Sequence, residues 1–372
     1  MNKSAKNELM FLTAAGTLLA LAFKHKKTAF ALAAGTAALA LSKSKRKNSF
    51  TGKTIIITGG SRGLGLALAK KLVAEDANVC LLARTEKDLT AAVQILENEF
   101  SNASVLTCVC DVTDPHQFRQ AVNRTIERWG TIDVLINNAG AILVGPFDSM
   151  TQDDFEAQLK IHLYANMNAT KEVLKHFRRT GEGQIINICS MGGKIAVPHM
   201  LPYDTSKFAL AGFSQGLTAE LAAENISVLT VYPALMRTGS PIQAVFKGDS
   251  EKEFSWFASA DVLPGLSAAA SDVAGQIVAA ACERRTELIP SFIGKARMAA
   301  GIIFPELMLW VMSGLNKLMP KDRTNHYQTG AESRTENSYL IPGLRGRSEK
   351  AELELNQVEK NDAEFNIGLT IH

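Results

Sequence analysis

The segment that most constrains the fold is residues 53–75, which read KTIIITGGSRGLGLALAKKLVAE. It opens on the β-branched run Thr54–Ile57, which is typical of a strand buried on both faces of a sheet. A glycine-rich turn follows, and leucine and alanine then recur at helical spacing. This order is that of the phosphate-binding corner of a βαβ unit, where the turn and the helix N-terminus receive an anion. The segment therefore predicts a nucleotide site, with a purely structural glycine turn as the alternative.

The rest of the chain up to residue 290 alternates short apolar runs with longer amphipathic ones. The apolar runs are 54–57, 77–83, 105–111, 132–136, 184–189, 226–231 and 287–289, and the helical patterns are 86–100, 115–129, 153–179, 203–224 and 271–283. Strands that alternate with helices of this length indicate a parallel sheet covered on both faces. The predicted fold class is therefore α/β, a Rossmann-type doubly wound sheet of about seven strands, with apolar helices added at the N-terminus.

Charge and cysteine usage narrow the function classes. The chain has 40 basic and 37 acidic side chains among its 372 residues, which gives no general reason to expect a nucleic-acid partner. No two cysteines have the spacing of a zinc site, so no metal is predicted. Four of the five cysteines lie in strand-like runs. All five are expected to be buried free thiols in a reducing compartment: Cys80, Cys108, Cys110, Cys189 and Cys282.

Composition divides the chain into four parts. Residues 1–49 form an N-terminal apolar segment with a basic linker, and residues 50–290 a Rossmann domain. Residues 291–320 form an apolar helical extension, and residues 321–372 a polar tail that is predicted to be flexible. Within the extension, Pro305 breaks the apolar run 298–319 into two pieces. That run is either a membrane-facing or substrate-entrance element, or a helix packed on the domain.

The N-terminal segment holds two uncharged runs, 9–23 and 28–41, separated by Lys24-His25-Lys26-Lys27. As helices they would each be about 22 Å long at ~1.5 Å per residue, which is short of the ~30 Å hydrocarbon core of a bilayer. Basic residues after each run favour the cytoplasmic side for both. We predict membrane association through one spanning and one re-entrant helix or two interfacial helices, with the remaining domain facing the cytoplasm. A helical pair packed on the domain or a partner, a signal peptide and another targeting segment remain alternatives.

Two arginines indicate which dinucleotide would bind. Arg84 ends the second predicted strand, where a carboxylate would bind the ribose hydroxyls of NAD and a cation suits the 2′-phosphate of NADP. Arg62, inside the glycine turn, would add a second cation to the same phosphate. The pair predicts NADP(H), although either arginine alone is an ordinary surface residue.

Polar residues at later strand ends supply a catalytic pattern. Asn137-Asn138-Ala139-Gly140 follows the fourth strand, where its alternative role is to close a loop through side-chain hydrogen bonds. Ser190 ends the fifth strand, and Tyr203 and Lys207 lie one helical turn apart. A phenol beside an ammonium can serve as a general acid or base, because the cation favours the phenolate. A serine hydroxyl can orient the substrate oxygen.

Over residues 51–290 the chain resembles the short-chain dehydrogenase/reductase family. The residues that carry the resemblance are Thr58-Gly59-Gly60-Ser61-Arg62-Gly63-Leu64-Gly65, Asp111-Val112, Asn137-Asn138-Ala139-Gly140, Ser190, Tyr203-Asp204-Thr205-Ser206-Lys207 and Tyr232-Pro233-Ala234 through Thr238. Ala234 stands where the family usually has glycine. The resemblance implies that Tyr203 is the proton donor or acceptor, that Lys207 lowers its pKa and holds the nicotinamide ribose, and that Ser190 orients the carbonyl.

The resemblance also implies the cofactor contacts. The glycine turn would cradle the phosphates, Asp111 and Val112 would contact adenine, Asn138 the cofactor's backbone and Thr238 the carboxamide. The full cofactor-binding set is Thr58, Gly59, Ser61, Arg62, Gly63, Leu64, Gly65, Arg84, Asp111, Val112, Asn138, Ala139, Gly140, Tyr203, Lys207, Pro233 and Thr238.

One position departs from the family pattern. The family's fourth catalytic residue is an asparagine on the helix after the fourth strand, and the matching residue here is His162, with Asn166 one turn later. A histidine there would anchor a water of the proton relay or titrate near neutral pH. The alternative is a helix-packing residue that weakens the relay.

The substrate is only indirectly indicated. The loop 191–202 and the insert 239–265 flank the expected pocket, and the insert carries four aromatic residues suited to an apolar lid or to plain packing: Phe246, Phe254, Trp256 and Phe257. Together with the apolar N-terminus they favour a lipophilic ketone or alcohol that is long-chain, retinoid-like or steroid-like. The rival hypotheses are a non-catalytic membrane sensor or scaffold, and a soluble enzyme with a targeting segment. The resemblance further implies a homodimer or homotetramer.

Overall fold

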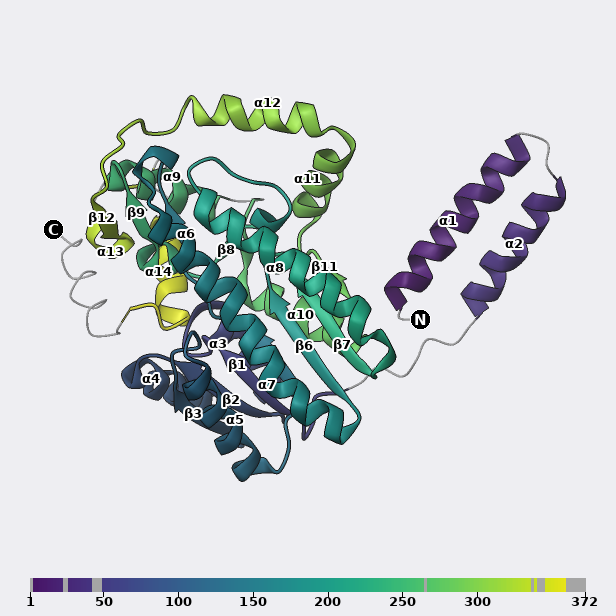
Figure 1. Cartoon of the computed structure of the whole chain (residues 1–372), viewed down its shortest axis with the longest axis horizontal. Coiled ribbons are helices and arrows are strands. Elements are labelled where there is room, and N and C mark those ends of the chain that lie inside the picture. The colour runs from purple at the N-terminus through teal and green to yellow at the C-terminus, as the bar shows by residue number, and fades with distance from the viewer. Residues whose placement is uncertain are drawn as a thin grey trace.

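A seven-stranded parallel sheet forms the centre of the protein (Figure 1), in the order β11-β7-β6-β4-β1-β2-β3. The computed structural model describes residues 3–22, 26–41, 49–263, 266–335, 338–339 and 345–358. The strands are β1 (Thr54–Thr58), β2 (Asn78–Ala83), β3 (Ser104–Val109), β4 (Val134–Asn137), β6 (Gly183–Ile188), β7 (Ile226–Val231) and β11 (Glu287–Leu288). The predicted Rossmann-like α/β fold is confirmed.

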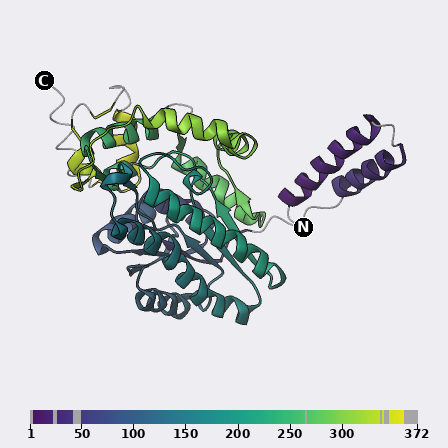
Figure 2. The ribbon, with the colours of Figure 1, turned by 45° about the horizontal axis from the view of Figure 1, so that its top comes forward.

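Helices cover both faces of the sheet, as Figures 1 and 2 show. They are α3 (Gly63–Val73), α4 (Glu86–Glu99) and α10 (Ala270–Cys282) on one face, and α5 (Pro115–Trp129), α7 (Ala165–Thr180) and part of α8 (Leu201–Glu220) on the other. Alternation along β1 explains this division, because Ile55 and Ile57 join the first core and Ile56 joins the second. All three side chains are fully buried.

The helix predicted over 153–179 is interrupted. It consists of α6 (Gln152–Leu159), a π-helical turn over Lys160–Tyr164, and α7. His162 lies inside this turn, and its main-chain carbonyl accepts a hydrogen bond from Asn166 Nδ2 at 2.8 Å. Such π turns are frequent at functional sites, and this one places His162 beside Ser206 of helix α8 (Leu201–Glu220).

The aromatic insert forms a small core of its own. β9 (Val245–Lys247) pairs with β5 (Leu143–Val144) and with β12 (Tyr327–Thr329), and α9 (Ser250–Val262) packs beside them. β8 (Met236–Arg237) pairs with β10 (Ala268–Ala269). Phe246, Phe254 and Phe257 are buried against one another in edge-to-face contacts, so these rings are packed residues and not an open lid.

The C-terminal region contains more structure than its composition indicates. The prediction of a flexible tail is wrong over β12, α13 (Gly330–Ser333) and α14 (Arg345–Glu354). A capping box between Thr329 and Glu332 starts α13, and Arg334 forms ion pairs with Glu349 and Glu352 of α14 at 3.0 and 2.9 Å. Because these contacts are polar, the sequence of this region shows no hydrophobic periodicity from which its helices could be predicted.

Two pairs of apolar helices lie at the periphery. α1 (Lys3–Ala22) and α2 (Lys26–Leu41) lie side by side in both ribbon views, joined by a 2.7 Å hydrogen bond from Thr36 to Thr13. α11 (Phe292–Ile303) and α12 (Pro305–Asn316) meet at 116°. Within the described residues, no one helix has the length and apolarity to cross a bilayer, and the bent α11–α12 pair alone passes that test jointly. The predicted basic linker lies at 42–48, outside the described residues.

Candidate active site

The glycine turn lies at the carboxyl edge of the sheet, between β1 and α3. Gly59 and Gly63 adopt φ values of +62° and +57°, which favour glycine. A β-carbon on Gly65 would lie 2.1 Å from the carbonyl oxygen of Gly59, so the turn closes only with glycine there. The result is a tight backbone corner with the first N–H groups of α3, including that of Leu64, at its rim.

The Asn138–Gly140 segment holds this turn in place. Thr58 Oγ1 accepts hydrogen bonds from the main-chain N–H groups of Asn138 and Ala139 at 2.9 and 3.0 Å. The Asn138 side chain donates to the carbonyl oxygens of Thr58 and Gly59, both at 3.0 Å. Asn138 therefore fixes the shape of the glycine turn.

Two guanidinium groups stand beside the turn. Arg62 pairs with Asp88 at a long 3.8 Å. Burial lowers the pKa of Arg62, Asp88 opposes that effect, and the nearby charge of Arg84 adds to it. Two cations with one carboxylate at 3.8 Å form a donor set that fits an anionic group.

Asp111 and Val112 follow β3 at the same edge. Asp111 Oδ1 accepts hydrogen bonds from the N–H and hydroxyl of Thr113, at 2.9 and 2.8 Å. Val112 is buried in the core below the edge. The Asp111 carboxylate thus shapes the loop that the sequence assigns to adenine.

Ser190, Tyr203 and Lys207 come together at the centre of this edge. The Tyr203 ring and Ser190 Oγ both lie against Gly192, because a β-carbon built there would be 3.3 Å from Tyr203 Cε1 and 3.4 Å from Ser190 Oγ. Ser190 Oγ accepts from the N–H of Gly192 at 3.0 Å. Lys207 Nζ lies 5.6 Å from the centroid of the Tyr203 ring and donates to the carbonyl oxygen of Ile188 at 3.1 Å. The phenol, the serine hydroxyl and the ammonium group therefore lie together at this edge.

The pKa shifts of this group differ from the expectation. Burial raises the pKa of Tyr203, and the neighbouring Ser190 side chain only partly opposes this. Burial also lowers the pKa of Lys207 to about 8. The expected lowering of the Tyr203 pKa by Lys207 is therefore not seen, because burial sets the direction of the shift.

His162 is fixed by hydrogen bonds on both ring nitrogens. The N–H of Ala141 donates to Nε2 at 3.2 Å, so the ring proton is on Nδ1, which lies 2.8 Å from Ser206 Oγ. Ser206 Oγ in turn donates to the main-chain carbonyl of Tyr203 at 2.6 Å. Burial lowers the pKa of His162 well below 6.5, with a further contribution from Lys207. The interpretation that His162 titrates near neutral pH is wrong, because its charged form is too costly to bury.

The segment after β7 completes the edge. The carbonyl oxygen of Pro233 accepts from the N–H of Met191 at 2.9 Å and ties this segment to the Ser190 loop. Thr238 is buried, and its Oγ1 accepts from the N–H of Ser240 at 3.2 Å. The sequence did not predict that Asn356 and Gln357 also reach this edge. Their segment has no motif or periodicity that could have indicated it.

Comparison with known proteins identifies the family. The model of the short chain dehydrogenase family matches residues 53–245, more than half of the 372-residue chain. The chain belongs to the short-chain dehydrogenase family. It is therefore an oxidoreductase of this family, whose fold binds a nicotinamide cofactor, NAD(P)(H).

Individual relatives agree with this assignment. Oxidoreductase BOA17 of Botryotinia fuckeliana is 37% identical over 194 residues, which cover 51% of this chain and 69% of the relative. A fatty acyl-CoA reductase of Acinetobacter baylyi is 34% identical over 194 residues, which cover 52% of this chain and 65% of the relative. The crystal structure of a short-chain dehydrogenase from Streptomyces avermitilis aligns with a TM-score of 0.62 at 25% identity, covering 72% of this chain and 98% of that one.

Proposed function

We propose that the protein is a membrane-associated, NADP(H)-dependent reductase of lipophilic carbonyl compounds. The observation that carries the proposal is the convergence of the Tyr203 side chain, the Ser190 hydroxyl and the buried Lys207 ammonium at the carboxyl edge of the sheet. Buried titratable groups of this kind are costly and occur mainly where chemistry requires them.

In this proposal each residue has one role. A nicotinamide cofactor held at this edge would supply the hydride for the carbonyl carbon. Ser190 Oγ hydrogen-bonds to the carbonyl oxygen and orients it, while Tyr203 gives that oxygen its hydroxyl proton, so that an alcohol forms. Lys207 then stabilises the resulting phenolate by its charge. Burial raises the pKa of Tyr203, so the phenol carries its proton at neutral pH, as a proton donor must.

The preference for NADP(H) over NAD(H) rests on Arg62 and Arg84. Burial lowers the pKa of Arg62, and the nearby positive charge of Arg84 lowers it further. A 2′-phosphate between the two arginines would offset their mutual repulsion. Asp88, the carboxylate near them, lies 3.8 Å from Arg62 and would leave both guanidiniums free to contact the phosphate. The phosphate would thus replace a repulsion by two charge-assisted contacts.

The lipophilic substrate class rests on the surroundings of Ser190 and Tyr203. Cys189 and Met191, on either side of Ser190, belong to one apolar cluster, which Met298 of α11 and Met308 of α12 extend. Tyr203 packs against a second cluster that includes Met200 and Phe257. A long-chain, retinoid-like or steroid-like ketone matches such walls, and a relative is named a fatty acyl-CoA reductase.

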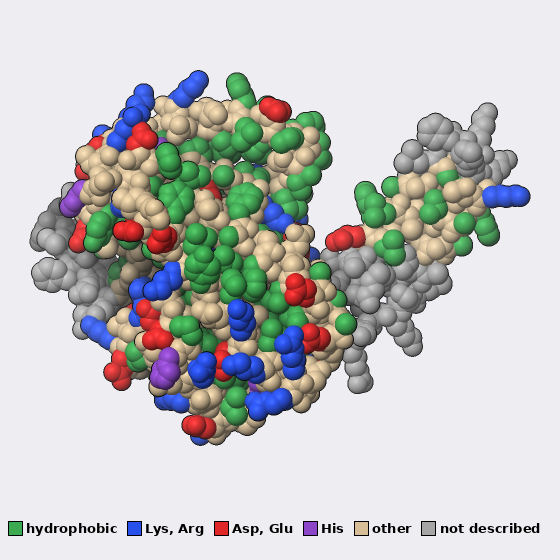
Figure 3. All heavy atoms as spheres, in the orientation of Figure 1, with side chains coloured by type: hydrophobic (Ala, Val, Ile, Leu, Met, Phe, Trp, Pro, Cys, Tyr) green, Lys and Arg blue, Asp and Glu red, His purple; other side chains and the backbone are tan. Residues whose placement is uncertain are grey.

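Membrane association is proposed for two apolar surfaces. On α11 and α12 the side chains of Phe292, Trp310 and Leu318 are 84%, 73% and 85% exposed, and Figure 3 shows hydrophobic side chains over this corner. Five basic and two acidic residues lie between 291 and 323, which suits an anionic lipid surface. On α1 and α2, Phe11 and Phe30 are 73% and 78% exposed. The domain would lie at the cytoplasmic face.

The proposal also includes self-association. Tyr164, Leu201 and Phe208, close to α7 or on α8, are 52%, 41% and 45% exposed. Apolar side chains on this helical face suit a homodimer or homotetramer, in which a second copy would cover them.

Activity is tested by NADPH oxidation with a panel of long-chain ketones, retinals and ketosteroids in detergent. The parent protein should turn over at least one class, and Tyr203→Phe should lose about 10²- to 10⁴-fold in kcat/KM, the usual contribution of a general acid. The rival function is a nucleotide sensor or scaffold. Tight NADPH binding without turnover of any of these classes, together with a biological activity that survives Tyr203→Phe, would favour that rival.

Membrane binding is tested by flotation of the full chain with neutral and with anionic vesicles. Replacing exposed Trp310 by Glu should weaken binding about tenfold or more, since one large apolar side chain contributes ~1.5–3 kcal/mol on burial. Tyr327→Glu, a change at a 64% exposed ring on β12, is the matched control. Equal vesicle binding by the parent and by Trp310→Glu would refute the proposal that α12 contacts the membrane.

A further inference from the structure

The chain's own C-terminal segment lies against the glycine turn. We call residues 355–358, which follow α14, the C-terminal strap. The carbonyl oxygen of Leu355 accepts a hydrogen bond from the N–H of Gly63 at 2.9 Å. Asn356 Nδ2 donates to the carbonyl oxygens of Ser61 at 2.9 Å and of Asp88 at 3.1 Å. The strap therefore takes up groups on the turn that the sequence assigns to the cofactor.

Gln357 joins the glycine turn to the segment after β7. Its Nε2 donates to the carbonyl oxygen of Thr238 at 3.1 Å, and its own carbonyl oxygen accepts from Gln243 at 3.0 Å. A β-carbon built on Gly63 would lie 3.1 Å from the same Nε2. The side chain is only 7% exposed, and its Oε1 has no hydrogen-bond partner. Gln357 thus fills the space between the two walls of the expected phosphate site.

Helix α14 fixes the strap in this position. Glu352, whose side chain is 3% exposed, pairs with Arg334 at 2.9 Å and accepts from Ser348 at 2.8 Å. A β-carbon on Gly239 would meet Glu352 at 2.6 Å, so α14 packs directly on the loop after Thr238. The strap is therefore a packed element with defined contacts.

The contacts are of a kind that a phosphate can replace. The N–H of Gly63 is the first of α3, at the positive end of an 11-residue helix. A phosphate oxygen forms stronger, charge-assisted hydrogen bonds with such a donor than a neutral peptide carbonyl does. The burial of an unpartnered Gln357 Oε1 also costs free energy, and that cost ends when the strap leaves.

We infer that the C-terminal strap competes with the cofactor's phosphates for the glycine turn and must leave before the cofactor binds. The inference rests on the proposed cofactor site. The last residues of α14 and the strap then weaken cofactor binding, because only the fraction of molecules with an open strap can bind the cofactor.

The test uses two substitutions at Asn356 in the full chain. Asn356 has φ +55°, which asparagine tolerates and a β-branched residue does not. Asn356→Val removes two hydrogen bonds and strains the strap, whereas Asn356→Gly removes the same bonds and keeps the backbone shape. Asn225→Val is the matched control, because Asn225 has φ +51° at the opposite edge of the sheet.

NADPH affinity is measured by fluorescence titration. We expect Asn356→Val to bind NADPH about tenfold more tightly than the parent, Asn356→Gly to lie between the two, and Asn225→Val to equal the parent. Unchanged or weaker binding by Asn356→Val, with melting temperature preserved, would overturn the strap inference alone. Absence of NADPH binding in every variant would instead refute the proposed cofactor.

Hydrogen exchange of the parent gives a second readout. Adding NADPH should raise exchange at residues 352–358 and lower it at the glycine turn, because one ligand replaces the other. Protection of both segments by NADPH would overturn the inference, since the strap would then close over the cofactor.

Discussion

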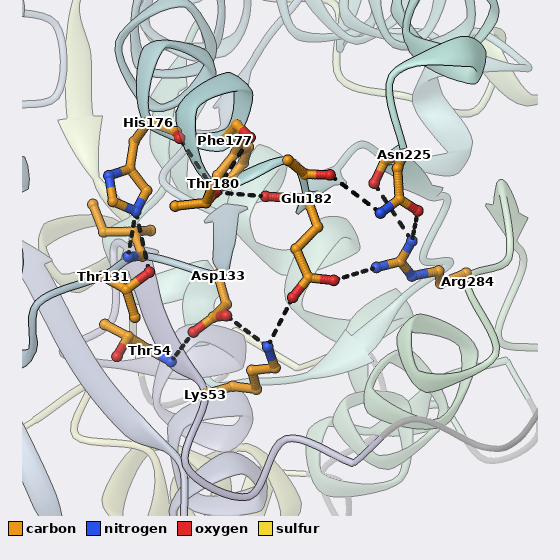
Figure 4. Close-up of polar contacts among 12 residues, drawn as sticks. Lys53, Thr54, Thr131, Asp133, His176, Phe177, Thr180, Glu182, Asn225 and Arg284 are labelled. Carbon is orange, nitrogen blue, oxygen red and sulfur yellow. Dashed lines mark hydrogen bonds and ion pairs between the residues drawn. The ribbon is translucent and has the colours of Figure 1, made fainter.

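The two edges of the central sheet differ in how their charged side chains are paired and buried. At the amino ends of the strands, Lys53 pairs with Asp133 at 2.7 Å and with Glu182 at 3.2 Å, and Arg284 pairs with Glu182 at 3.6 Å (Figure 4). At the carboxyl ends, Lys207 donates to a main-chain carbonyl, and burial lowers its pKa. Asp133 raises the pKa of Lys53 by its hydrogen bond.

The difference separates stability from function. Lys53, Asp133 and Glu182 each directly precede a strand, and their pairs join the starts of β1, β4 and β6. Such partly exposed pairs contribute modestly to folding. A buried ammonium without a carboxylate partner costs folding free energy and is kept where its charge has a task. Substitutions at the two edges should therefore change activity and stability in opposite patterns.

The largest effect is expected at Lys207. Lys207→Met should lower kcat/KM for ketone reduction by about 10²- to 10⁴-fold, because the phenolate of Tyr203 loses its stabilising charge. Its melting temperature at neutral pH should equal or exceed that of the parent, since the cost of burying the ammonium is removed. The folded pKa of about 8 lies below 10.5, so the cost of the charged lysine fades as pH rises through that window.

Thermal unfolding at several pH values checks this sign. The stability advantage of Lys207→Met should be greatest below pH 8 and shrink toward 10.5. If Lys207→Met were both inactive and strongly destabilised at neutral pH, Lys207 would have a structural role like that of the charged residues at the amino edge.

The next effect concerns cofactor choice. Arg84→Ala should weaken NADPH binding about 10- to 100-fold, because a charge-assisted contact with the 2′-phosphate is lost, and leave NADH binding within about twofold. Titration of both cofactors measures the ratio. An equal loss for NADH and NADPH would show that Arg84 acts on the fold of the turn.

At the amino edge the expected effect is on stability. Asp133 accepts hydrogen bonds from Lys53 Nζ at 2.7 Å and from the N–H of Thr54 at 2.8 Å. Asp133→Asn should lower the free energy of unfolding by about 0.2–1 kcal/mol, since the charge of a partly exposed pair with Lys53 is lost. The kcat/KM value should stay within about twofold of the parent. A large loss of activity in a folded Asp133→Asn variant would contradict the claim that charges at the amino edge serve stability alone.

The smallest effect is expected at His162. Because its pKa lies well below 6.5, the ring stays neutral, so parent and His162→Asn should have the same shape of kcat/KM profile between about pH 6 and 8. The variant loses part of the link to Ser206, and kcat/KM should fall about threefold to tenfold. An inflection near neutral pH that disappears in His162→Asn would contradict the assigned neutral tautomer.

Sequence patterns predicted what depends on local order. The β-branched run of β1, the glycine turn and α3 follow one another within about 20 residues, so their strand, turn and helix signals are readable directly. Ser190, Tyr203 and Lys207 met as expected because parallel strands bring their carboxyl ends to one edge.

Features set by tertiary contacts could not be predicted. The π turn at His162 leaves no mark in the helical pattern, and the raised pKa of Tyr203 follows from burial that only the packed structure reveals. Asn356 lies almost 300 residues after its partner Ser61, and nothing in its polar surroundings indicates that contact. Long-range polar contacts of this kind carry no periodic signal.

The most direct test of the proposed reductase follows the hydride itself. Deuterated NADPH and a long-chain ketone in mixed micelles are incubated with the parent and with Tyr203→Phe, and the alcohol is analysed by mass spectrometry. We expect one deuterium on the carbinol carbon with the parent and essentially no alcohol with the variant. Bound NADPH without deuterated alcohol from any lipophilic ketone, or equal product from both proteins, would contradict the proposed role of the carboxyl edge.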